Sequence, residues 1–491
     1  MSKETSNYKY FAGNLALFTI SNFVSKILVF LLVPFYTNVL STRDYGIADV
    51  MQTTLLLLVP ALTINMGEAA LRYGIDRSDK RDEIFKVGLK FVGLASLLTA
   101  IACGVGCIFT GQPVRWYLFL FIFLFAANCT YEFLILFFQG CERVKIVVCG
   151  SVFSTIVLIT SNIIFLLFVK AGLNGYLLSQ MLAFSLASLL MILLGKKTMP
   201  DVVRLARKEN QDNGSDEEKR EFEKELIGYG VPMIAYSTGS WINNAADRYL
   251  VSMIKGVAVN GIYGVAYKIP AILTVFQRIF AQSWQMSATK SYGDENSKEF
   301  FSAMYSGYNT FMVTGCSFLI LAVRPVALFM FRKDFYSAWQ YVPPLLISVI
   351  FGALTGFLGS ICLAYKDSKA MGWATGIGAV LNVILNLILI PGYGAMGAAI
   401  ATALSYFTMY FLAYRKVAGY VKLDVKLTRD YVSYILLVAE ACVMIAGSKV
   451  SIPDVWVYTA CASIFLVIFF LYLSDIKRIF GILKIFGRDR N

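Results

Sequence analysis

The sequence predicts an all-α polytopic membrane protein with about fourteen membrane-spanning helices, and three observations predict it. First, 58% of the 491 residues are apolar and only 15% are charged, whereas a soluble domain carries about 25% charged residues. Second, apolar runs long enough to cross a bilayer recur along the whole chain. Third, Lys and Arg are concentrated in alternate loops. This composition excludes a soluble enzyme and a nucleic-acid-binding domain, despite the net charge of +13.

The apolar runs define the expected spans in chain order. The first extends from residue 11 to about 38, which is too long for a signal peptide, and we expect it to be retained. The remaining spans are expected at 46–66, 87–109, 116–138, 146–169, 175–194, 229–253, 260–281, 300–323, 343–364, 371–391, 394–414, 431–446 and 455–473.

The distribution of Lys and Arg predicts the orientation of these spans. With the N-terminus inside, 31 of the 44 Lys and Arg fall in inside segments, seven fall in outside loops and six remain within spans. Cytoplasmic loops of membrane proteins are enriched in Lys and Arg. We therefore expect both termini in the cytoplasm, and most of the positive charge reflects this orientation.

Several kinds of chemistry have no support in the sequence. The chain has no histidine, which excludes histidine-dependent catalysis and His-based zinc sites. The nine cysteines form no CxxC motif, and no GxxxxGK[ST] motif for nucleotide phosphates occurs. We expect a transporter rather than an enzyme, without a cofactor or a metal.

The chain divides into two similar halves. Three pairs of positions recur at separations of 215 to 224 residues: Gly46 with Gly261, Gly172 with Gly394, and Asn162 with Asn386. Such repeats are typical of alternating-access transporters. The expected domains are a six-helix bundle at 1–194, a solvated cytoplasmic linker with a short surface helix at 195–228, a second six-helix bundle at 229–414, and two accessory helices with a basic cytoplasmic tail at 415–491.

Charged residues within spans are the candidate functional residues, because an ionised group at the bilayer centre costs at least about 2.5 kcal/mol. Lys26 lies far from both ends of the first span. Lys268 and Arg278 are ten residues apart, which on a continuous helix places them on one face, about 15 Å apart. Lys90 and Arg324 lie near span ends, where their side chains can reach the surface, and Glu440 belongs to the accessory helices.

The candidates carry a surplus of positive charge, which suits an anionic cargo such as a phosphate. Salt bridges between packed helices are the alternative role, with Glu68 and Arg72 spaced to pair on one helix. The expected cargo-binding cations are Lys26, Arg72, Arg248, Lys268 and Arg278, and the expected coupling or gating carboxylates are Asp49, Glu68 and Asp247.

Three segments, at 21–50, 229–269 and 385–407, carry a family resemblance. With DRYLV followed by GIYGVAYKI as the most specific part, the chain resembles the polysaccharide-biosynthesis flippases of the multidrug/oligosaccharidyl-lipid/polysaccharide exporter superfamily. The resemblance implies two MATE-like six-helix bundles plus two helices in the bacterial cytoplasmic membrane. It also implies movement of an undecaprenyl-diphosphate-linked oligosaccharide from the inner to the outer leaflet through a cationic central cavity. Asp247, Arg248 and Lys268 fall in the matching segments, and Lys26 occupies a span where such proteins often carry a basic residue.

Two other cargos remain open. A cation-coupled multidrug exporter of the same superfamily would need an acidic site, whereas the candidates here are mainly basic. A peptidoglycan lipid precursor differs from the expected cargo only in its sugars and peptide. A coupling ion, H⁺ or Na⁺, and polysaccharide polymerases are the further partners that the resemblance suggests, alongside the bilayer and without nucleic acid.

Overall fold

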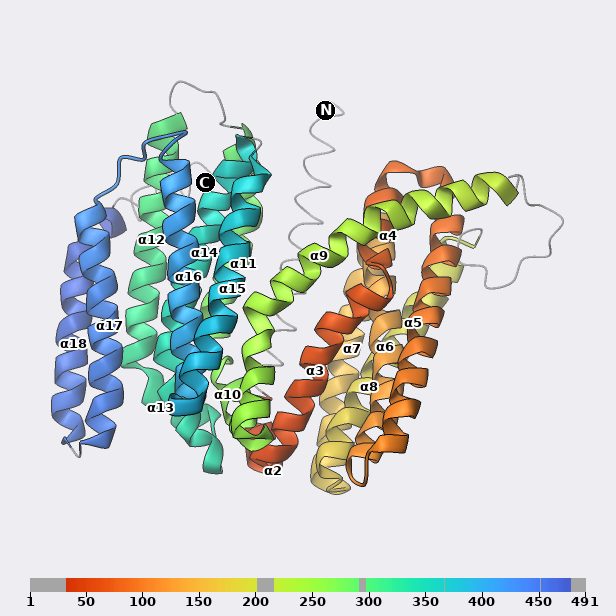
Figure 1. Ribbon diagram of the computed structural model, residues 1–491, viewed down its shortest axis with the longest axis horizontal. Helices are drawn as coiled ribbons and strands as arrows, with labels where there is room; N and C mark the ends of the chain where they lie inside the picture. Colours follow the sequence, from red (N-terminus) through yellow and green to blue (C-terminus); the bar gives the residue numbers. More distant parts are fainter. Residues whose placement is uncertain (1–31, 201–215, 291–296, 366, 451, 478–491) are drawn as a thin grey trace, which may run out of the picture. The chain divides into compact units, whose positions relative to one another are not determined.

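The computed structural model describes residues 32–200, 216–290, 297–365, 367–450 and 452–477. Over these residues the chain forms helices and connecting turns without any β-strand (Figure 1), so the predicted all-α class is confirmed. Ten of the described helices are long and apolar enough to cross a membrane, or up to twelve if each of two bent helix pairs is one span. The protein is therefore a multi-pass membrane protein, and the full count of fourteen spans stays a prediction.

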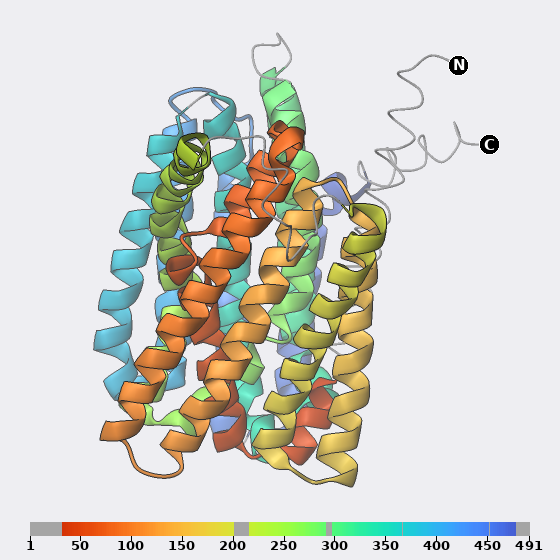
Figure 2. The same cartoon turned by 90° about the vertical axis from the view of Figure 1, so that its right-hand side faces the viewer.

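The chain forms two compact units that meet between Trp241 and Ile242, which we call unit 1 and unit 2. In Figure 2 the long helices of unit 1 run lengthwise beside one another. Unit 1 contains α2 (Val33–Val39), α3 (Thr42–Leu62), α4 (Met66–Asp76), α5 (Arg81–Phe109), α6 (Val114–Gly140), α7 (Val144–Asn162), α8 (Gly172–Thr198) and the first part of α9 (Asp216–Lys255).

Local sequence explains why the expected second span, which corresponds to α3, ends before a separate short helix, α4. The Ser41 side chain caps α3 by accepting a hydrogen bond from the backbone N–H of Asp44 at 3.1 Å. After α3, Ile64 and Asn65 both have left-handed backbone conformations, with φ of 55° and 49°. A helix cannot continue through such residues, so α4 starts anew at Met66.

Unit 1 is held together by an aromatic core and by a close approach of two helices. The rings of Phe85, Phe125 and Phe137 are fully buried. Where α4 meets α6, a Cβ atom on Gly140 would lie 2.6 Å from the carbonyl oxygen of Ala70. Only glycine fits there, because the obstacle is backbone that no side-chain rotation can move aside.

We therefore expect Gly140→Ala to lower the free energy of unfolding by about 1–3 kcal/mol, the usual cost of overpacking. Thermal unfolding of the purified protein in detergent measures the effect. Gly104→Ala is the matched control, since Gly104 is also helical and a Cβ there would meet no atom within 4 Å. Equal melting temperatures for the two variants would contradict the close approach of α4 and α6.

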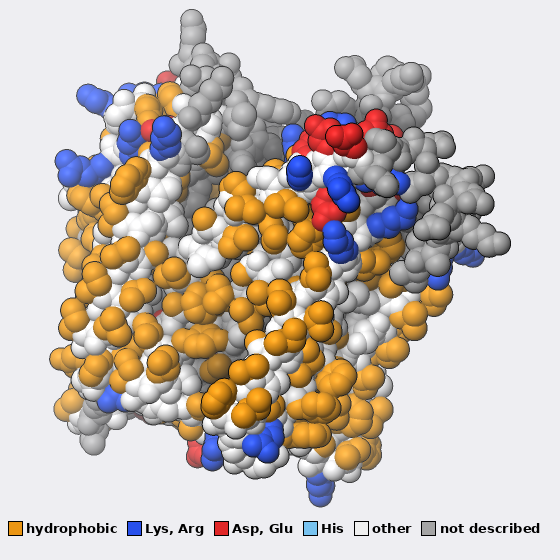
Figure 3. Space-filling view, turned by 45° about the vertical axis from the view of Figure 1, so that its right-hand side comes forward, with side chains coloured by type: hydrophobic (Ala, Val, Ile, Leu, Met, Phe, Trp, Pro, Cys, Tyr) orange, Lys and Arg blue, Asp and Glu red, His pale blue; other side chains and the backbone are white. Residues whose placement is uncertain are grey.

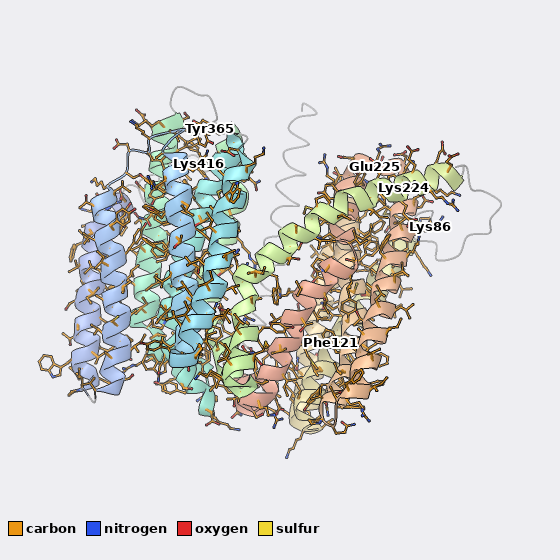
Figure 4. The ribbon with its side chains drawn as sticks, viewed as in Figure 1. Lys86, Phe121, Lys224, Glu225, Tyr365 and Lys416 are labelled. Atoms are coloured by element: carbon orange, nitrogen blue, oxygen red, sulfur yellow. The ribbon has the colours of Figure 1, made fainter. Side chains whose placement is uncertain are left out.

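The expected linker helix and the expected seventh span form one continuous helix, α9, of 40 residues. Its first part docks on unit 1 through apolar contacts: Phe222 and Leu226 are buried, and the Phe222 ring meets the Tyr73 ring edge to face. Figure 4 shows Lys224 and Glu225 of α9 and Lys86 of α5 at the same end of unit 1, and Figure 3 shows charged side chains gathered there beside an apolar flank. This segment was expected to be a solvated surface helix, but the structure packs its apolar face against the bundle.

Two ion pairs accompany this contact, Lys90 with Glu223 at 2.6 Å and Arg77 with Glu225 at 3.8 Å. Exposed pairs of this kind contribute only about 0–1 kcal/mol.

We expect Phe222→Ala to release this part of α9 and Glu223→Gln to leave it docked. Limited proteolysis of the purified protein measures this difference, and equal cleavage of the two variants would show that the charges, rather than the aromatic contact, hold α9.

Unit 2 is built around α14 (Val342–Ala364), most of whose residues are buried. Two of its helix pairs are sharply bent: α10 (Val257–Ala266) and α11 (Pro270–Lys290) by 52°, and α12 (Ser297–Leu321) and α13 (Val323–Met330) by 66°. The other elements are the 3₁₀ helix η4 (Lys333–Tyr341), α15 (Ser368–Tyr393), α16 (Ala395–Val417), α17 (Leu427–Lys449), α18 (Asp454–Leu471) and the last part of α9.

The internal duplication is visible in backbone geometry. Gly172 and Gly394 precede or begin corresponding helices, and both have left-handed φ values, +53° and +58°. Asn162 and Asn386 are both fully buried, and each donates from Nδ2 to the carbonyl oxygen four residues earlier, at 2.7 and 2.9 Å. At these matched positions of the two halves, the same residue type therefore has a similar positive φ or makes the same side-chain-to-backbone hydrogen bond.

The accessory helices α17 and α18 are bonded to α12. Ser317 of α12 donates to the buried Glu440 carboxylate at 2.5 Å. Asn309 of α12 accepts from Tyr434 of α17 at 3.0 Å and donates to Tyr472, just after α18, at 3.2 Å. These buried hydrogen bonds fix the accessory pair as part of unit 2.

One capped loop joins α14, α15 and the end of α16. Asp367 caps α15 by accepting from the backbone N–H of Ala370 at 3.0 Å, and it pairs with Lys416 at 3.2 Å. Figure 4 shows Lys416 near Tyr365, at the same end of unit 2. The hydrogen bond from Tyr420, followed by those from Ala370 and Lys416, lowers the pKa of Asp367 to about 2. The cap is therefore complete above the ordinary carboxyl range and weakens only as the pH falls towards 2.

Candidate functional site

Asp247 is the centre of a buried polar network in unit 2. It lies on α9, with only 2% of its surface exposed. Its Oδ2 atom accepts hydrogen bonds from the hydroxyls of Tyr263 at 2.6 Å and Tyr267 at 2.5 Å. Its Oδ1 atom accepts from the backbone N–H of Arg248 at 2.8 Å. Charge-assisted hydrogen bonds such as these are how a protein stabilises a carboxylate away from water.

The network continues from Asp247 into α16 and α15. The Thr402 hydroxyl donates to Oδ2 of Asp247 at 3.4 Å and accepts from Nδ2 of Asn382 at 3.4 Å. Asn386 then donates to Oδ1 of Asn382 at 2.9 Å. All three side chains are buried, and Oδ1 of Asn386 has no hydrogen-bond partner among the described residues. The result is a line of neutral oxygen and nitrogen groups leading to one carboxylate.

Arg248 and Lys268 lie beside this network. The Arg248 guanidinium sits over the Tyr267 ring, 4.5 Å from its centroid, so Tyr267 contacts the cation with its face and Asp247 with its hydroxyl. Lys268 follows Tyr267 directly and is half-buried. The structure thus brings together two of the predicted residues, Asp247 and Arg248, around Tyr267, and Lys268 is the next residue along the chain.

The predicted shared helix face of Lys268 and Arg278 is wrong. Residues 267–269 form the break between α10 and α11, where the chain bends by 52°, and Lys268 sits in that break. Pro270 causes the interruption, since it lacks an N–H to bond the preceding turn and starts the new helix. Arg278 lies on α11 with an exposed side chain. Helical spacing therefore gives no estimate of the distance between the two cations.

The other predicted residues belong to unit 1 or fall outside the description. Asp49 is half-buried on α3, and Glu68 is half-buried on α4. Arg72 is exposed and pairs with Asp76 at 3.1 Å, one turn further along, rather than with Glu68 as its spacing suggested. Lys26 lies outside the described residues, so its expected role stays a prediction.

Sequence reasoning missed the neutral members of the network. Tyr263 and Tyr267 are spaced i, i+4 within GIYGVAYKI, which was the available signal, but tyrosines are common in this chain. Asn386 was noticed only as a repeat position, and Asn382 and Thr402 were not singled out. Glu132 of α6 was also overlooked, although it is a carboxylate inside an expected span, within electrostatic range of Glu68.

The site combines one buried carboxylate, neutral oxygen and nitrogen groups, and neighbouring cations. Within the described part of the chain, no three His, Cys, Asp or Glu side chains gather as a metal site. Asp247 and Thr402, with the amide oxygens beyond them, are hard oxygen ligands of the kind that bind alkali cations or a proton. Arg248 and Lys268 add positive charge at the helix break. These features define a membrane transporter with a charged site built on broken helices.

The protein belongs to a known family within that class. The family model described as polysaccharide biosynthesis protein matches residues 11–285, more than half of the chain, so the chain belongs to this family. The match includes all eight residues predicted for the site.

Two archaeal proteins are similar in sequence. The "Probable low-salt glycan biosynthesis flippase Agl15" of Haloferax volcanii is 26% identical over 187 residues, which is 37% of this chain and 39% of that protein. The "Uncharacterized membrane protein MJ1375" of Methanocaldococcus jannaschii is 22% identical over 250 residues, 51% of this chain and 59% of that protein. Each alignment covers less than two thirds of the relative.

Solved structures share the fold at low sequence identity. The lipid II flippase MurJ in an inward closed conformation has a TM-score of 0.67 at 14% identity, covering 95% of this chain and 99% of that one. An inward-facing MATE family multidrug resistance transporter has a TM-score of 0.64 at 13% identity, covering 80% and 95%. The predicted MATE-like architecture is thereby confirmed as a fold.

Proposed function

We propose that this protein is a flippase that moves an undecaprenyl-diphosphate-linked oligosaccharide from the inner to the outer leaflet by alternating access. The observation that carries the proposal is membership of the polysaccharide biosynthesis family over residues 11–285, which include the Asp247 network and its neighbouring cations. O-antigen, capsule or exopolysaccharide repeat units are the cargo class. The name of the Haloferax volcanii relative, a probable glycan biosynthesis flippase, supports the same activity.

The cations suit the diphosphate of such a cargo. Arg248, Lys268 and Arg278 lie on α9 to α11, at or near a helix break, where broken helices of transporters bind their substrates. Lys26 and Arg72 are the other two proposed cargo-binding cations. The acceptor atoms of Asp247 are engaged by tyrosine, threonine and backbone donors.

Coupling is proposed to pass through carboxylates. Asp247, surrounded by neutral oxygen groups, would take up H⁺ or Na⁺, and Asp49 and Glu68 are the other proposed coupling or gating carboxylates. An inside-negative membrane potential also favours outward movement of the anionic head group, by about 2.3 kcal/mol per charge per 100 mV. We place the protein in the bacterial cytoplasmic membrane, with both termini in the cytoplasm and polysaccharide polymerases as its functional neighbours.

Analysis of lipid-linked intermediates after gene deletion tests this function. We expect an undecaprenyl-diphosphate glycan to accumulate in the inner leaflet and the surface polymer to disappear, with both reversed by the wild-type gene on a plasmid. Accumulation of a peptidoglycan precursor instead would identify the alternative lipid cargo. Unchanged lipids together with increased sensitivity to cationic dyes would favour the multidrug exporter and overturn the proposal.

A further inference from the structure

Unit 2 contains a pocket that the transport site does not use. It has a volume of about 690 Å³ and lies between η4, α10, α13 and the end of α17. From the geometry of this pocket we infer that it is a saccharide-binding site on the outer face of the protein, an inference that rests on the proposed glycan flippase function. The flipped head group of the cargo and a free glycan are the two sources of such a ligand.

The base of the pocket is rigid and buried. Arg324 and Trp339 both line it, with only 7% and 4% of their surfaces exposed. The Arg324 guanidinium stacks on the Trp339 ring, 4.7 Å from its centroid. It also pairs with Asp454 at 2.5 Å and donates to the carbonyl oxygen of Met444 at 3.0 Å. Arg324 was expected to extend to the membrane surface, but these three contacts hold it inside the protein.

One polar atom of this base is unsatisfied. The Nε–H of Arg324 is buried without a hydrogen-bond partner among the described residues. Leaving a donor of this kind unpaired is costly, and sites that bind a ligand or ordered water are where such atoms occur. Arg324 therefore has one donor that the described residues leave unused, on a side chain that lines the pocket.

The rim supplies hydrogen-bonding groups of both kinds. Lys333, Asp334, Ser337 and Gln340, all on η4, line the pocket together with the Tyr336 ring. Donors and acceptors are thus mixed around an aromatic side chain over one short helix. A ring with many hydroxyl groups needs this mixture, because each hydroxyl both donates and accepts.

The balance of charged side chains in the pocket indicates which part of the cargo it suits, the sugar or the diphosphate. The positive charge of Arg324 is matched by Asp454, and Lys333 is accompanied in the pocket by Asp334. With its charges balanced, the pocket has no excess of positive charge to attract a phosphate. A neutral or weakly acidic saccharide fits these groups better than an anion does.

The pocket lies at the end of unit 2 expected to face outward. Seven of its nine lining residues follow the ninth expected span and precede the tenth, in a loop that the distribution of Lys and Arg assigns to the outer side. The opposite end carries Lys416 and the other basic residues of the expected cytoplasmic loops. A head group delivered to the outer leaflet would emerge on the side of this pocket.

Saturation-transfer NMR with the full-length protein in lipid nanodiscs tests the inference. The probes are N-acetylglucosamine, galactose, glucuronate and, for comparison, inorganic pyrophosphate. We expect at least one saccharide to bind, pyrophosphate not to displace it, and a Tyr336→Ala, Gln340→Ala double variant to weaken binding by about tenfold or more, the loss of about 1.4 kcal/mol of contact energy. Tyr393→Ala is the control, since Tyr393 is exposed near the same end of unit 2 but outside the pocket.

The inference is overturned if no saccharide binds, if the control weakens binding as much as the double variant, or if pyrophosphate displaces the sugar. Adding undecaprenyl-diphosphate-N-acetylglucosamine to the nanodisc separates the two sources: displacement of the free sugar identifies the flipped head group, and its absence identifies a free glycan. Failure of the proposed function is recognised separately, because gene deletion would then leave the lipid-linked glycans unchanged whether or not the purified protein binds sugars.

Discussion

Replacement of both Lys268 and Arg278 by alanine is expected to stop glycan export while the protein still reaches the membrane. A hydrogen bond to a charged group contributes about 1.5–3 kcal/mol, so loss of two such contacts with the diphosphate slows transport by about a hundredfold to ten-thousandfold. The fold should survive, because Lys268 is half-buried at a helix break and Arg278 is exposed. Surface polymer and inner-leaflet lipid-linked glycan are the quantities to measure.

Two variants make this result interpretable. Exchange of the two residues, Lys268→Arg with Arg278→Lys, keeps both charges and should retain part of the export. Lys86→Ala removes an exposed cation that pairs with Asp82 at 3.7 Å on α5, and it should leave export unchanged. Normal polymer production by the double alanine variant would show that neither cation binds the cargo.

The fold class was predictable because the membrane imposes simple rules on sequence. Spans need long apolar runs, and cytoplasmic loops attract Lys and Arg. The duplication was predictable at Gly172 and Gly394, where a left-handed backbone conformation needs the same residue in both halves. At such positions the backbone conformation restricts the residue type, so the duplication can be recognised from the sequence alone.

Helix breaks and long-range partners were not predictable in this way. The break at residues 267–269 interrupts an apolar run that looks continuous, and it invalidated the helical spacing of Lys268 and Arg278. Arg324 pairs with Asp454, which is 130 residues away, so no local pattern could reveal that it is buried. The continuity of α9 was hidden because its first part is charged and its second part is apolar.

The candidate site was predicted through its charges and missed in its neutral part. An ionised group inside a span is conspicuous because placing it in the membrane costs free energy. Asp247, Arg248 and Lys268 were selected as candidates for that reason. Tyrosine, asparagine and threonine are common in spans and draw no attention. Only the hydrogen-bond geometry shows that Tyr263, Tyr267 and Thr402 all converge on one carboxylate oxygen.

The second large expected effect concerns Asp247. Two substitutions of this residue distinguish the loss of its charge from the loss of its side-chain shape. Asp247→Asn removes the charge but keeps the shape and one acceptor oxygen, so we expect export to stop while the free energy of unfolding changes by about 1 kcal/mol or less. Asp247→Ala removes both acceptors. The Tyr263 and Tyr267 hydroxyls, 3.0 Å apart, can still bond to each other, so about one buried hydroxyl is left unsatisfied, at a cost of about 1–3 kcal/mol.

Export assays in cells and thermal unfolding in detergent, over a range of Na⁺ concentrations and pH, separate the two effects. If Asp247 binds Na⁺ as the coupling ion, added Na⁺ should raise the melting temperature of the wild type but not of Asp247→Asn, because a ligand stabilises only a protein that binds it. Glu440→Gln is the matched control: Glu440 is also a buried carboxylate of unit 2, bonded to Ser317 and outside the hydrogen-bond network of Asp247. Export that survives in Asp247→Asn, or is lost equally in Glu440→Gln, would remove the reason for assigning coupling to Asp247, since burial of a carboxylate alone would then account for both results.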